Sequence, residues 1–460
     1  MVFSSMTFLA FFMPIVTGLY FISKNNNIRN AVILLFSLLF YAWGEPKWIL
    51  VMLLTVGVNY ICGLMIDKAT SKMKKIAWMS VGVILGVGFL VYFKYFGFIV
   101  DNICNVFGIS NGIDTPALPI GISFYTFQVL TYTVDVYRGK VKVQKSFFTL
   151  LLYVSFFPQL IAGPIVNYKD IEGQLKERRI TIDDFAEGLI RFFIGLSKKI
   201  LLANTCGELL SYINVTSGIS VLGAWVSAIA YTLQIYFDFS GYSDMAIGLG
   251  RMFGFHFLEN FNYPYISKSV TEFWRRWHIS LGAFFREYVY IPLGGNRVAT
   301  CKHIRNILIV WALTGIWHGA SWNFLLWGMY YGSLLVIEKF LFLRVKEKLP
   351  AILNVTLTLP FIIVGWVIFY HTNITDGIRH IGALVGVGAE LADVASIYYL
   401  KHYLGFIVIA IIAALPWKNT KLGKIFNKPL VKVVLVSVIA IISIGTLIGQ
   451  SYNPFLYFRF

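Results

Sequence analysis

Charged residues are scarce in this chain of 460 residues. Asp, Glu, Lys and Arg together make up 13% of it, and hydrophobic residues make up 58%. Because a typical soluble domain carries about 25% charged residues, this composition excludes the two or three soluble domains that the length alone would suggest. A mean hydropathy of +0.71 supports the same conclusion. We therefore predict a polytopic membrane protein that is surrounded by membrane lipid.

Acidic residues are the scarcer charge type, with 22 Asp and Glu against 39 Lys and Arg. In a soluble chain the net charge of +17 would indicate a nucleic-acid partner. Here the basic residues stand in short clusters between apolar runs, a pattern that membrane topology explains better. We therefore predict no nucleic-acid partner.

Cysteine is also scarce, with four residues in the whole chain. The four are Cys62, Cys104, Cys206 and Cys301. They form no CxxC pair and lack metal-ligand spacing, so the sequence predicts no metal site and no bound cofactor. We interpret them as small apolar packing residues, and a reactive thiol or a Cys104–Cys206 bridge are the alternatives.

Long apolar runs are abundant, and a spanning helix needs about 20 mostly apolar residues. The first run, 7–22, has no Lys or Arg before it and no small-residue cleavage site after it. It therefore reads as a retained helix rather than a signal peptide. The runs are 7–22, 31–44, 48–66, 76–100, 118–137, 187–203, 221–237, 306–320, 322–341, 351–370, 403–416 and 433–450. We predict about ten to twelve crossings. Pro158 and Pro164 break a further run at 147–166, which is a candidate re-entrant segment.

Clusters of basic residues set the predicted orientation. The clusters are Lys68, Lys72, Lys74 and Lys75; Arg138, Lys140, Lys142 and Lys145; and Lys418, Lys421, Lys424, Lys428 and Lys432. By the positive-inside rule these loops are cytoplasmic, whereas the loops 101–117 and 204–219, which contain no Lys or Arg, face outward. No internal repeat or linker is visible. We predict one integral domain, 1–460, with an extracytoplasmic tail at 451–460.

An ionisable residue stands inside the apolar and aromatic stretch TGIWHGASWNFLLWG, residues 314–328. Ionisable groups in membrane segments are costly and indicate function by default. His318 has two interpretations: an interior histidine bonded between helices, or a general base that accepts a proton from a hydroxyl. Gly315, Gly319 and Gly328 predict a close approach of neighbouring backbones.

A second histidine lies in TEFWRRWHISLGAFFREYVYIPLGGNR, residues 271–297. This stretch is too polar to cross lipid freely and too aromatic for an ordinary loop, so it suits a cytoplasmic or re-entrant segment that lines a cavity. Headgroup contacts explain Arg297 and Lys302 adequately. They explain the grouping of His278 with Trp274 and Trp277 less well.

Two carboxylates lie in IYFDFSGYSD, residues 235–244. We interpret Asp238 and Asp244 as structural groups paired with hydroxyls or arginines, and a direct catalytic role is the alternative. Ser240 and Ser243 lie beside them, but the GxSxG elbow of serine hydrolases is absent.

Several motifs together resemble one family. They are FWRRWHISL, EYVYIPLGGNR, TGIWHGASWNFLLWG, QIYFDFSGYSDMAIGLGRMFGF (234–255), FNYPYIS (261–267) and FFPQLIAGPI (156–165). In this order and spacing they resemble the membrane-bound O-acyltransferases, in particular the bacterial branch that O-acetylates exported polysaccharides. The resemblance covers nearly the whole chain.

The resemblance implies an all-α protein, with a ring of membrane helices around a thinned centre and a tunnel from a cytoplasmic donor site to an outer acceptor site. It also implies re-entrant or interfacial helices. It assigns His318 as the catalytic residue and His278 as the second active-site residue. It further implies that the donor is an acyl thioester, carried by coenzyme A or by an acyl carrier protein. The expected donor-binding and cavity residues are Trp274, Arg275, Arg276, Trp277, Arg286 and Trp317.

The chain ends in PFLYFRF, which the charge pattern places outside the membrane. Tyr457 has two interpretations: an interfacial aromatic anchor, or an acyl carrier, because the tail resembles the carboxy-terminal tyrosine motif of related systems. In the second interpretation an extracytoplasmic acyltransferase of the SGNH/GDSL type accepts the acyl group. The predicted location is the bacterial cytoplasmic membrane.

Three functions compete at this point. The leading one is the transfer of an acetyl group from a cytoplasmic thioester across the membrane for acetylation of an exported envelope polysaccharide, with alginate, peptidoglycan and secondary wall polymers all open as acceptors. The second is D-alanyl transfer to teichoic acid, whose transferases resemble this chain but work with a small separate membrane peptide. The third, of another class, is a polysaccharide transporter or flippase, which the many helices and buried polar groups would also suit.

Overall fold

The computed structural model describes residues 1–109, 113–216, 220–342, 349–417, 420–450 and 455–456, with the side chains of 214–216 excluded. Throughout this described part the regular elements are helices and none is a strand, which confirms the predicted all-α class. The predicted acyl carrier Tyr457 lies outside the described residues.

The chain divides into two compact units. Unit 1 comprises Met1–Phe192 and Tyr242–Leu258, and unit 2 comprises Phe193–Gly241 and Glu259–Phe460. Two helices, α10 (Ile182–Ser197) and α12 (Val221–Met252), contribute residues to both units. The single integral domain remains a prediction.

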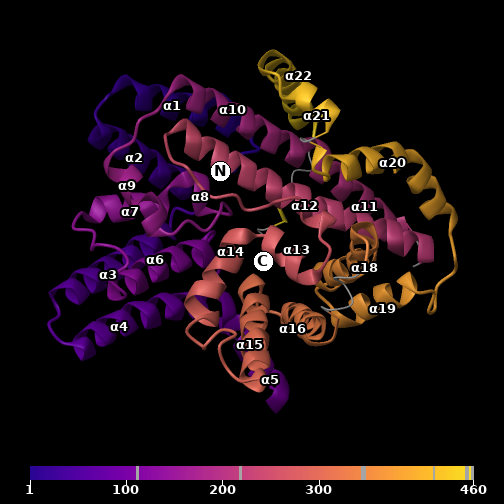
Figure 1. Ribbon diagram of the computed structural model, residues 1–460, viewed down its shortest axis with the longest axis horizontal. Helices are drawn as coiled ribbons and strands as arrows, with labels where there is room; N and C mark the ends of the chain where they lie inside the picture. Colours follow the sequence, from indigo (N-terminus) through magenta and orange to yellow (C-terminus); the bar gives the residue numbers. More distant parts are fainter. Residues whose placement is uncertain (110–112, 217–219, 343–348, 418–419, 451–454, 457–460) are drawn as a thin grey trace. The chain divides into compact units, whose positions relative to one another are not determined.

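Unit 1 is built from helices that follow the apolar runs of the sequence. Its elements are η1 (Phe8–Phe12), α1 (Met13–Ile22), α2 (Asn26–Gly44), α3 (Ile49–Lys68), α4 (Lys72–Leu90), η2 (Val91–Tyr95), α5 (Phe96–Phe107), α6 (Ile122–Tyr137), α7 (Phe147–Ser155), α8 (Phe157–Leu160) and α9 (Tyr168–Lys176). Helices α3, α4 and α6 pack together (Figure 1). Asn25 and Ser71 cap α2 and α4 by accepting backbone N–H bonds, so polar residues mark where the apolar helices begin.

Prolines break the candidate re-entrant segment as the sequence predicts. The chain leaves α7 at Phe156, and the short α8 has Pro158 in its first turn, where the missing N–H costs no helical hydrogen bond. All four cysteines carry free thiols, so the alternative Cys104–Cys206 bridge is wrong.

Seven helical segments of the described chain are long and apolar enough to cross a membrane. They are Asn26–Gly44, Ile49–Lys68, Lys72–Phe107, Trp322–Phe342, Ala351–Tyr370, Val394–Ala413 and Pro429–Gly449. The protein is thus a multi-pass membrane protein. The other predicted runs also form helices, among them the shorter apolar helix Phe8–Ile22. The total of ten to twelve crossings, the ring and the tunnel remain predictions.

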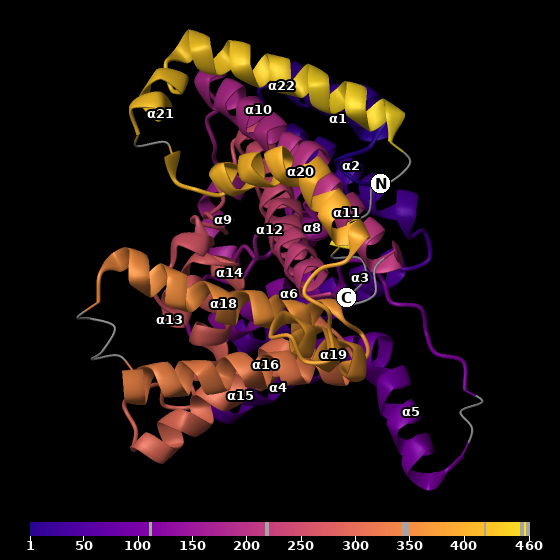
Figure 2. The ribbon, with the colours of Figure 1, turned by 90° about the vertical axis from the view of Figure 1, so that its right-hand side faces the viewer.

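Unit 2 contains the two histidine motifs. Besides its parts of α10 and α12, its elements are η3 (Lys198–Ala203), α11 (Asn204–Thr216), η4 (Pro264–Ile266), α13 (Val270–Arg276), α14 (Ile279–Phe285), η5 (Arg286–Tyr290), α15 (Thr300–His318), α16 (Trp322–Ile337), η6 (Glu338–Phe342), α18 (Ala351–Tyr370), α19 (Ile374–Leu384), α20 (Val394–Ala413), α21 (Lys421–Phe426) and α22 (Pro429–Gly449). Helices α15 and α16 lie side by side, and α18 lies against α16 (Figure 2).

Glycines explain the close packing of α15 and α16. A Cβ added at Gly315 would collide with the carbonyl oxygen of Phe324, and one at Gly328 would collide with the carbonyl oxygen of Trp311. The predicted approach of the two backbones is therefore confirmed. It brings Trp311, Trp327 and Tyr331 into one aromatic core, whose further members include Trp277 and Trp366.

Candidate active site

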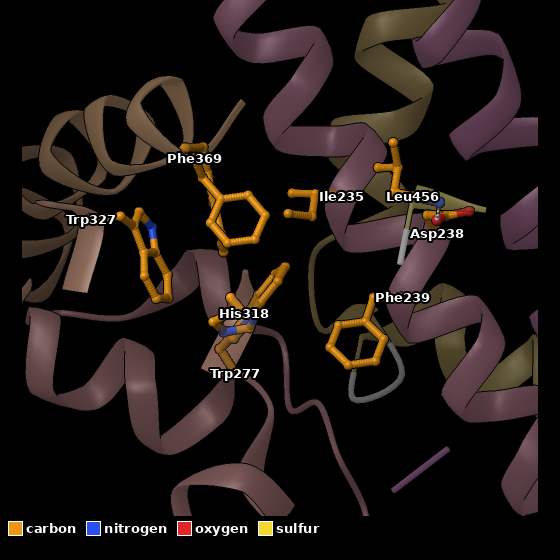
Figure 3. A pocket seen from close by; sticks show the side chains of 9 residues that line it. Ile235, Asp238, Phe239, Trp277, His318, Trp327, Phe369 and Leu456 are labelled. Carbon is orange, nitrogen blue, oxygen red and sulfur yellow. Dashed lines mark hydrogen bonds between the residues drawn. The ribbon is translucent and has the colours of Figure 1, made fainter. Parts of the chain in front are cut away.

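A pocket lies inside unit 2 (Figure 3). Its lining residues are Ile235, Asp238, Phe239, Trp277, His318, Trp327, Trp366, Phe369 and Leu456. They come from α12, the α13–α14 junction, α15, α16, α18 and the C-terminal segment. Most of these side chains are apolar, so a few polar groups determine what chemistry the pocket can perform.

His318 is the last residue of α15, and its side chain is buried in an aromatic wall. Its ring centroid lies 5.0 Å from that of Trp317, 5.0 Å from that of Trp327 and 5.3 Å from that of Phe369. All three contacts are edge-on, with interplanar angles of 73° to 87°. The rings therefore fix the orientation of the imidazole at the pocket wall.

His278 caps α14 in a left-handed backbone conformation, with φ 47° and ψ 54°. This region is uncommon for a residue other than glycine, and such strain concentrates at functional sites. The side chain is 2% exposed, and its ring stands perpendicular to Phe239 at 4.7 Å. The segment that contains it, 259–299, is outside the seven candidate spans. Burial lowers the pKa of His278 to about 3, so the ring is neutral at pH 7.

Asn260 determines which nitrogen of His278 carries the proton. The Asn260 Oδ1 atom accepts the backbone N–H of Ser280 at 3.2 Å and the Ser280 hydroxyl at 2.9 Å. The same oxygen lies 3.2 Å from Nδ1 of His278, which must therefore donate. Nε2 then carries the lone pair, and it is buried without a hydrogen-bond partner among the described residues.

The two histidines, which are 40 positions apart in the sequence, lie against the same indole. The Trp317 ring is 6.0 Å from that of His278 and 5.0 Å from that of His318. His318 lines the pocket, whereas His278 is not a lining residue and packs against Phe239, which is one. The structure thus brings the two predicted residues together.

The other predicted cavity residues divide into two groups. Trp277 lines the pocket, while Trp274 packs behind it, 5.4 Å from Trp327. None of the three predicted arginines is a lining residue. Arg275 and Arg286 are exposed. Arg276 binds the Glu272 carboxylate at 2.8 Å and the carbonyl oxygen of Asn262 at 3.0 Å.

Both predicted structural carboxylates have cationic partners. Asp244 accepts two bonds from the Arg191 guanidinium, at 2.8 and 3.1 Å. Asp238 binds Nζ of Lys199 at 2.7 Å, and its other oxygen accepts the backbone N–H of Leu456 at 2.9 Å. These contacts support a structural role for both groups, although Asp238 also lines the pocket.

Sequence reasoning missed several residues of the site. Lys199 is buried and lies inside the predicted span 187–203, and an ionisable residue within such a span is a signal that could have drawn attention to it. Asn260 and Phe369 gave no comparable local signal. Among the described residues, no group of three or more His, Cys, Asp or Glu side chains is placed to hold a metal ion.

The fold and the site define a multi-pass helical membrane protein with a buried histidine at an aromatic pocket. The model of the membrane-bound O-acyltransferase family matches residues 33–375. The chain belongs to the membrane-bound O-acyltransferase family, and it is an O-acyltransferase.

Three relatives illustrate the range of similarity. The chain is 38% identical to the probable alginate O-acetylase AlgI of Azotobacter vinelandii, over 100% of both chains. It is 32% identical to the peptidoglycan O-acetyltransferase of Helicobacter pylori, over 100% of this chain and 98% of that one. Its similarity to the teichoic acid D-alanyltransferase of Bacillus subtilis is 29% over 54% of this chain and 68% of the relative.

Proposed function

We propose that this protein moves an acetyl group from a cytoplasmic thioester across the bacterial cytoplasmic membrane for O-acetylation of an exported polysaccharide. The full-length similarity to an alginate O-acetylase and a peptidoglycan O-acetyltransferase supports this reaction. The observation that carries the proposal is the pocket itself, because His318 and Leu456, the residue before Tyr457, line the same space.

The pocket residues suit acyl transfer from a thioester. A thioester is already activated, so the enzyme has to deprotonate the acceptor hydroxyl and stabilise the oxyanion. His318 is the general base. Trp327 is the candidate oxyanion donor, because its indole N–H is buried without a hydrogen-bond partner in the described part of the chain. His278 presents a lone pair at Nε2, so it orients the donor or acceptor by accepting a hydrogen bond.

Tyr457 is the proposed first acceptor. His318 takes the proton of its phenol, whose ordinary pKa near 10 makes a base necessary. The phenolate oxygen then attacks the thioester carbonyl, the carbon–sulfur bond breaks, and the thiol leaves with the proton from His318. The resulting tyrosyl ester passes its acetyl group to an extracytoplasmic acyltransferase of the SGNH/GDSL type.

The charge of the pocket favours acetyl over D-alanyl transfer. A D-alanyl group carries an ammonium, which a pocket would receive with a free carboxylate. The only acidic residue among the nine lining residues is Asp238, and Lys199 and the Leu456 N–H already bind it. The neutral acetyl group needs no such partner. Membership of an enzyme family leaves the transporter alternative without support.

We propose the binding site of the acyl donor from the positions of positively charged side chains. Arg275 and Arg286 are exposed and can bind the phosphates of acetyl coenzyme A or an acidic carrier protein. Arg276 is already paired with Glu272, so we expect it to position the segment rather than to bind the donor.

The decisive experiment compares two tail variants in cells that make the polymer. Tyr457→Phe should preserve protein abundance and abolish polysaccharide acetylation, because only the nucleophile is removed. Tyr452→Phe, which removes another tail hydroxyl, is the matched control. Mass spectrometry of wild-type protein trapped with acetyl coenzyme A should find acetyl on the C-terminal peptide. Full polysaccharide acetylation by Tyr457→Phe would refute Tyr457 as the acyl carrier, the step called the relay below. The identity of the acetylated polymer would decide among alginate, peptidoglycan and wall polymers.

A further inference from the structure

The C-terminal segment of the chain is bound at several points to the region around η3. Ser443 of α22 donates to the Ser197 hydroxyl at 3.0 Å. Asn204 donates its amide to Gln450 at 3.1 Å. Leu456 donates its backbone N–H to Asp238, the ion-pair partner of Lys199. The chain is therefore bound on both sides of 451–454.

The Lys199–Asp238 pair is the most deeply buried of these contacts. Both side chains are 3% exposed, and Nζ lies 2.7 Å from Oδ1. Removing two charges from water is expensive, so such a pair is weak evidence for a role in stability. Its geometry indicates another role: the carboxylate uses one oxygen for the lysine and the other for a backbone N–H that is 218 residues away in sequence.

We propose that the Lys199–Asp238 pair is the docking site for the C-terminal tail of this chain. Lys199 holds the carboxylate in place, and the carboxylate binds the main chain at Leu456 with a charge-assisted hydrogen bond. The Leu456 side chain enters the pocket wall beside Asp238 (Figure 3). Both members of the pair are positioning residues.

This docking site, called the dock below, also affects catalysis if Tyr457 is the acyl acceptor, so its catalytic role rests on the proposed function. Tyr457, the proposed acyl acceptor, follows Leu456 directly in the sequence. Docking at Leu456 therefore tethers the nucleophile at the pocket that contains His318. The hydrogen bond to Asp238 requires only a backbone N–H at position 456. The packing of the Leu456 side chain in the pocket wall depends on the shape of that side chain.

The test measures tail accessibility in the full-length protein purified in detergent. Lys199→Met/Asp238→Leu removes both charges together, because replacing a buried pair by apolar residues is often neutral for stability whereas removing one partner is not. Carboxypeptidase should trim the tail of this variant at least tenfold faster than that of the wild type. The matched control is Arg191→Met/Asp244→Leu, which removes another ion pair of α12 and should leave trimming unchanged. Trimming of the Lys199→Met/Asp238→Leu protein at the wild-type rate would overturn the dock.

A second pair of variants covers the case in which the double variant does not fold. Leu456→Pro removes the N–H and leaves the ion pair intact, whereas Leu456→Ala keeps the N–H and shortens the side chain. We expect Leu456→Pro to be trimmed at least tenfold faster than Leu456→Ala. Equal trimming of the two would overturn the main-chain contact as the docking interaction.

Single-turnover transfer from acetyl coenzyme A to the tail separates the dock from the relay. The double variant should transfer at least tenfold more slowly, while its KM for acetyl coenzyme A stays that of the wild type, because the donor does not bind through the tail. An unchanged transfer rate would overturn the positioning role. Fast trimming of the double variant together with full polysaccharide acetylation by Tyr457→Phe would refute the relay and support the dock.

Discussion

Unit 2 contains two pairs of histidines whose surroundings differ. His371 and His380 bond to each other, with Nε2 of the first 2.9 Å from Nδ1 of the second, and His380 donates its Nε2–H to the carbonyl oxygen of Ala224 at 3.0 Å. The imidazoles of His278 and His318 instead lie against one indole. His278 uses one nitrogen and leaves the other without a hydrogen-bond partner among the described residues.

This difference distinguishes a structural pair of histidines from a candidate catalytic pair. A histidine whose two nitrogens are both engaged has no lone pair left for a substrate, so His380 links α19 to α12 and can do little else. A buried nitrogen without a protein partner is costly, which makes it a candidate to accept a hydrogen bond from a substrate. His278 has such a nitrogen, and His318 lines the pocket in which a substrate would bind.

Removal of His318 is the change with the largest expected effect. His318→Ala should insert and purify normally but lose about 10²–10⁴-fold in turnover, the usual contribution of a general base. Thioester consumption by the purified protein, with acetyl coenzyme A as donor, measures this loss. The comparison of the two pairs would fail if His380→Ala lost as much turnover per folded molecule as His318→Ala.

The Trp327 N–H offers a finer test of the same pocket. Trp327→Phe keeps an aromatic ring against His318 but removes the donor, and the loss of one oxyanion donor costs about 10²-fold in kcat. Trp322→Phe, at a residue of the same helix that is 52% exposed, is the control and should retain full turnover. Equal kcat values for the two variants would exclude the indole as the oxyanion donor.

Substitutions of Asn260 test whether turnover depends on the tautomer of His278. Asn260→Ala should cost about tenfold in turnover, less than the 10² that a misplacement of about 1 Å can cost, because it frees the imidazole without removing it. Asn260→Asp instead places a negative charge beside Nδ1 and should raise the pKa of His278. Its pH–rate profile should then gain an acid limb, and a profile identical to that of the wild type would contradict the assigned role of Nε2.

The second pair should affect stability rather than turnover. His380→Ala leaves the Ala224 carbonyl and the His371 ring without their partner, which costs about 1–3 kcal/mol. Turnover per folded molecule should not change. Thermal melting in detergent, measured alongside thioester consumption, checks both parts of this prediction.

The smallest expected effect is a dependence of the melting temperature on pH. Burial, and then the neighbouring His380, lower the pKa of His371 to about 4 from its ordinary 6.5. Burial also lowers the pKa of His380. The unfolded chain therefore binds more protons than the fold between these values, so stability is full above pH 6.5 and falls as pH decreases toward 4. His371→Asn/His380→Asn should flatten this part of the melting curve relative to the wild type, and an unchanged slope would contradict it.

The prediction of the fold from sequence was accurate where local pattern decides. Every predicted apolar run overlaps a helix over most of its length. The clearest boundary error is the run 221–237, which ends just before Asp238 in the sequence, whereas α12 continues to Met252. Lys199 and Arg191 form ion pairs with the two carboxylates of this helix, and no local pattern shows that these cations are near.

The site was predictable to a similar degree. The aromatic motifs identified His278 and His318, because an ionisable residue in an apolar run is conspicuous in any sequence. The partners of these residues were not predictable. Asn260, 18 residues from His278, and Trp327 on the next helix look like ordinary residues until packing places them.

The sequence by itself determined that this chain is a helical membrane protein, and its motifs indicated an acyltransferase with two histidines. Composition and periodicity are local, and the lipid environment acts on them segment by segment. Only the tertiary structure decided that Asp238 binds both Lys199 and the main chain at Leu456, and that His278 keeps a lone pair at Nε2. Hydrogen bonds between residues far apart in sequence depend on how helices pack, because direction and distance, rather than residue type, determine whether a buried polar group finds its partner.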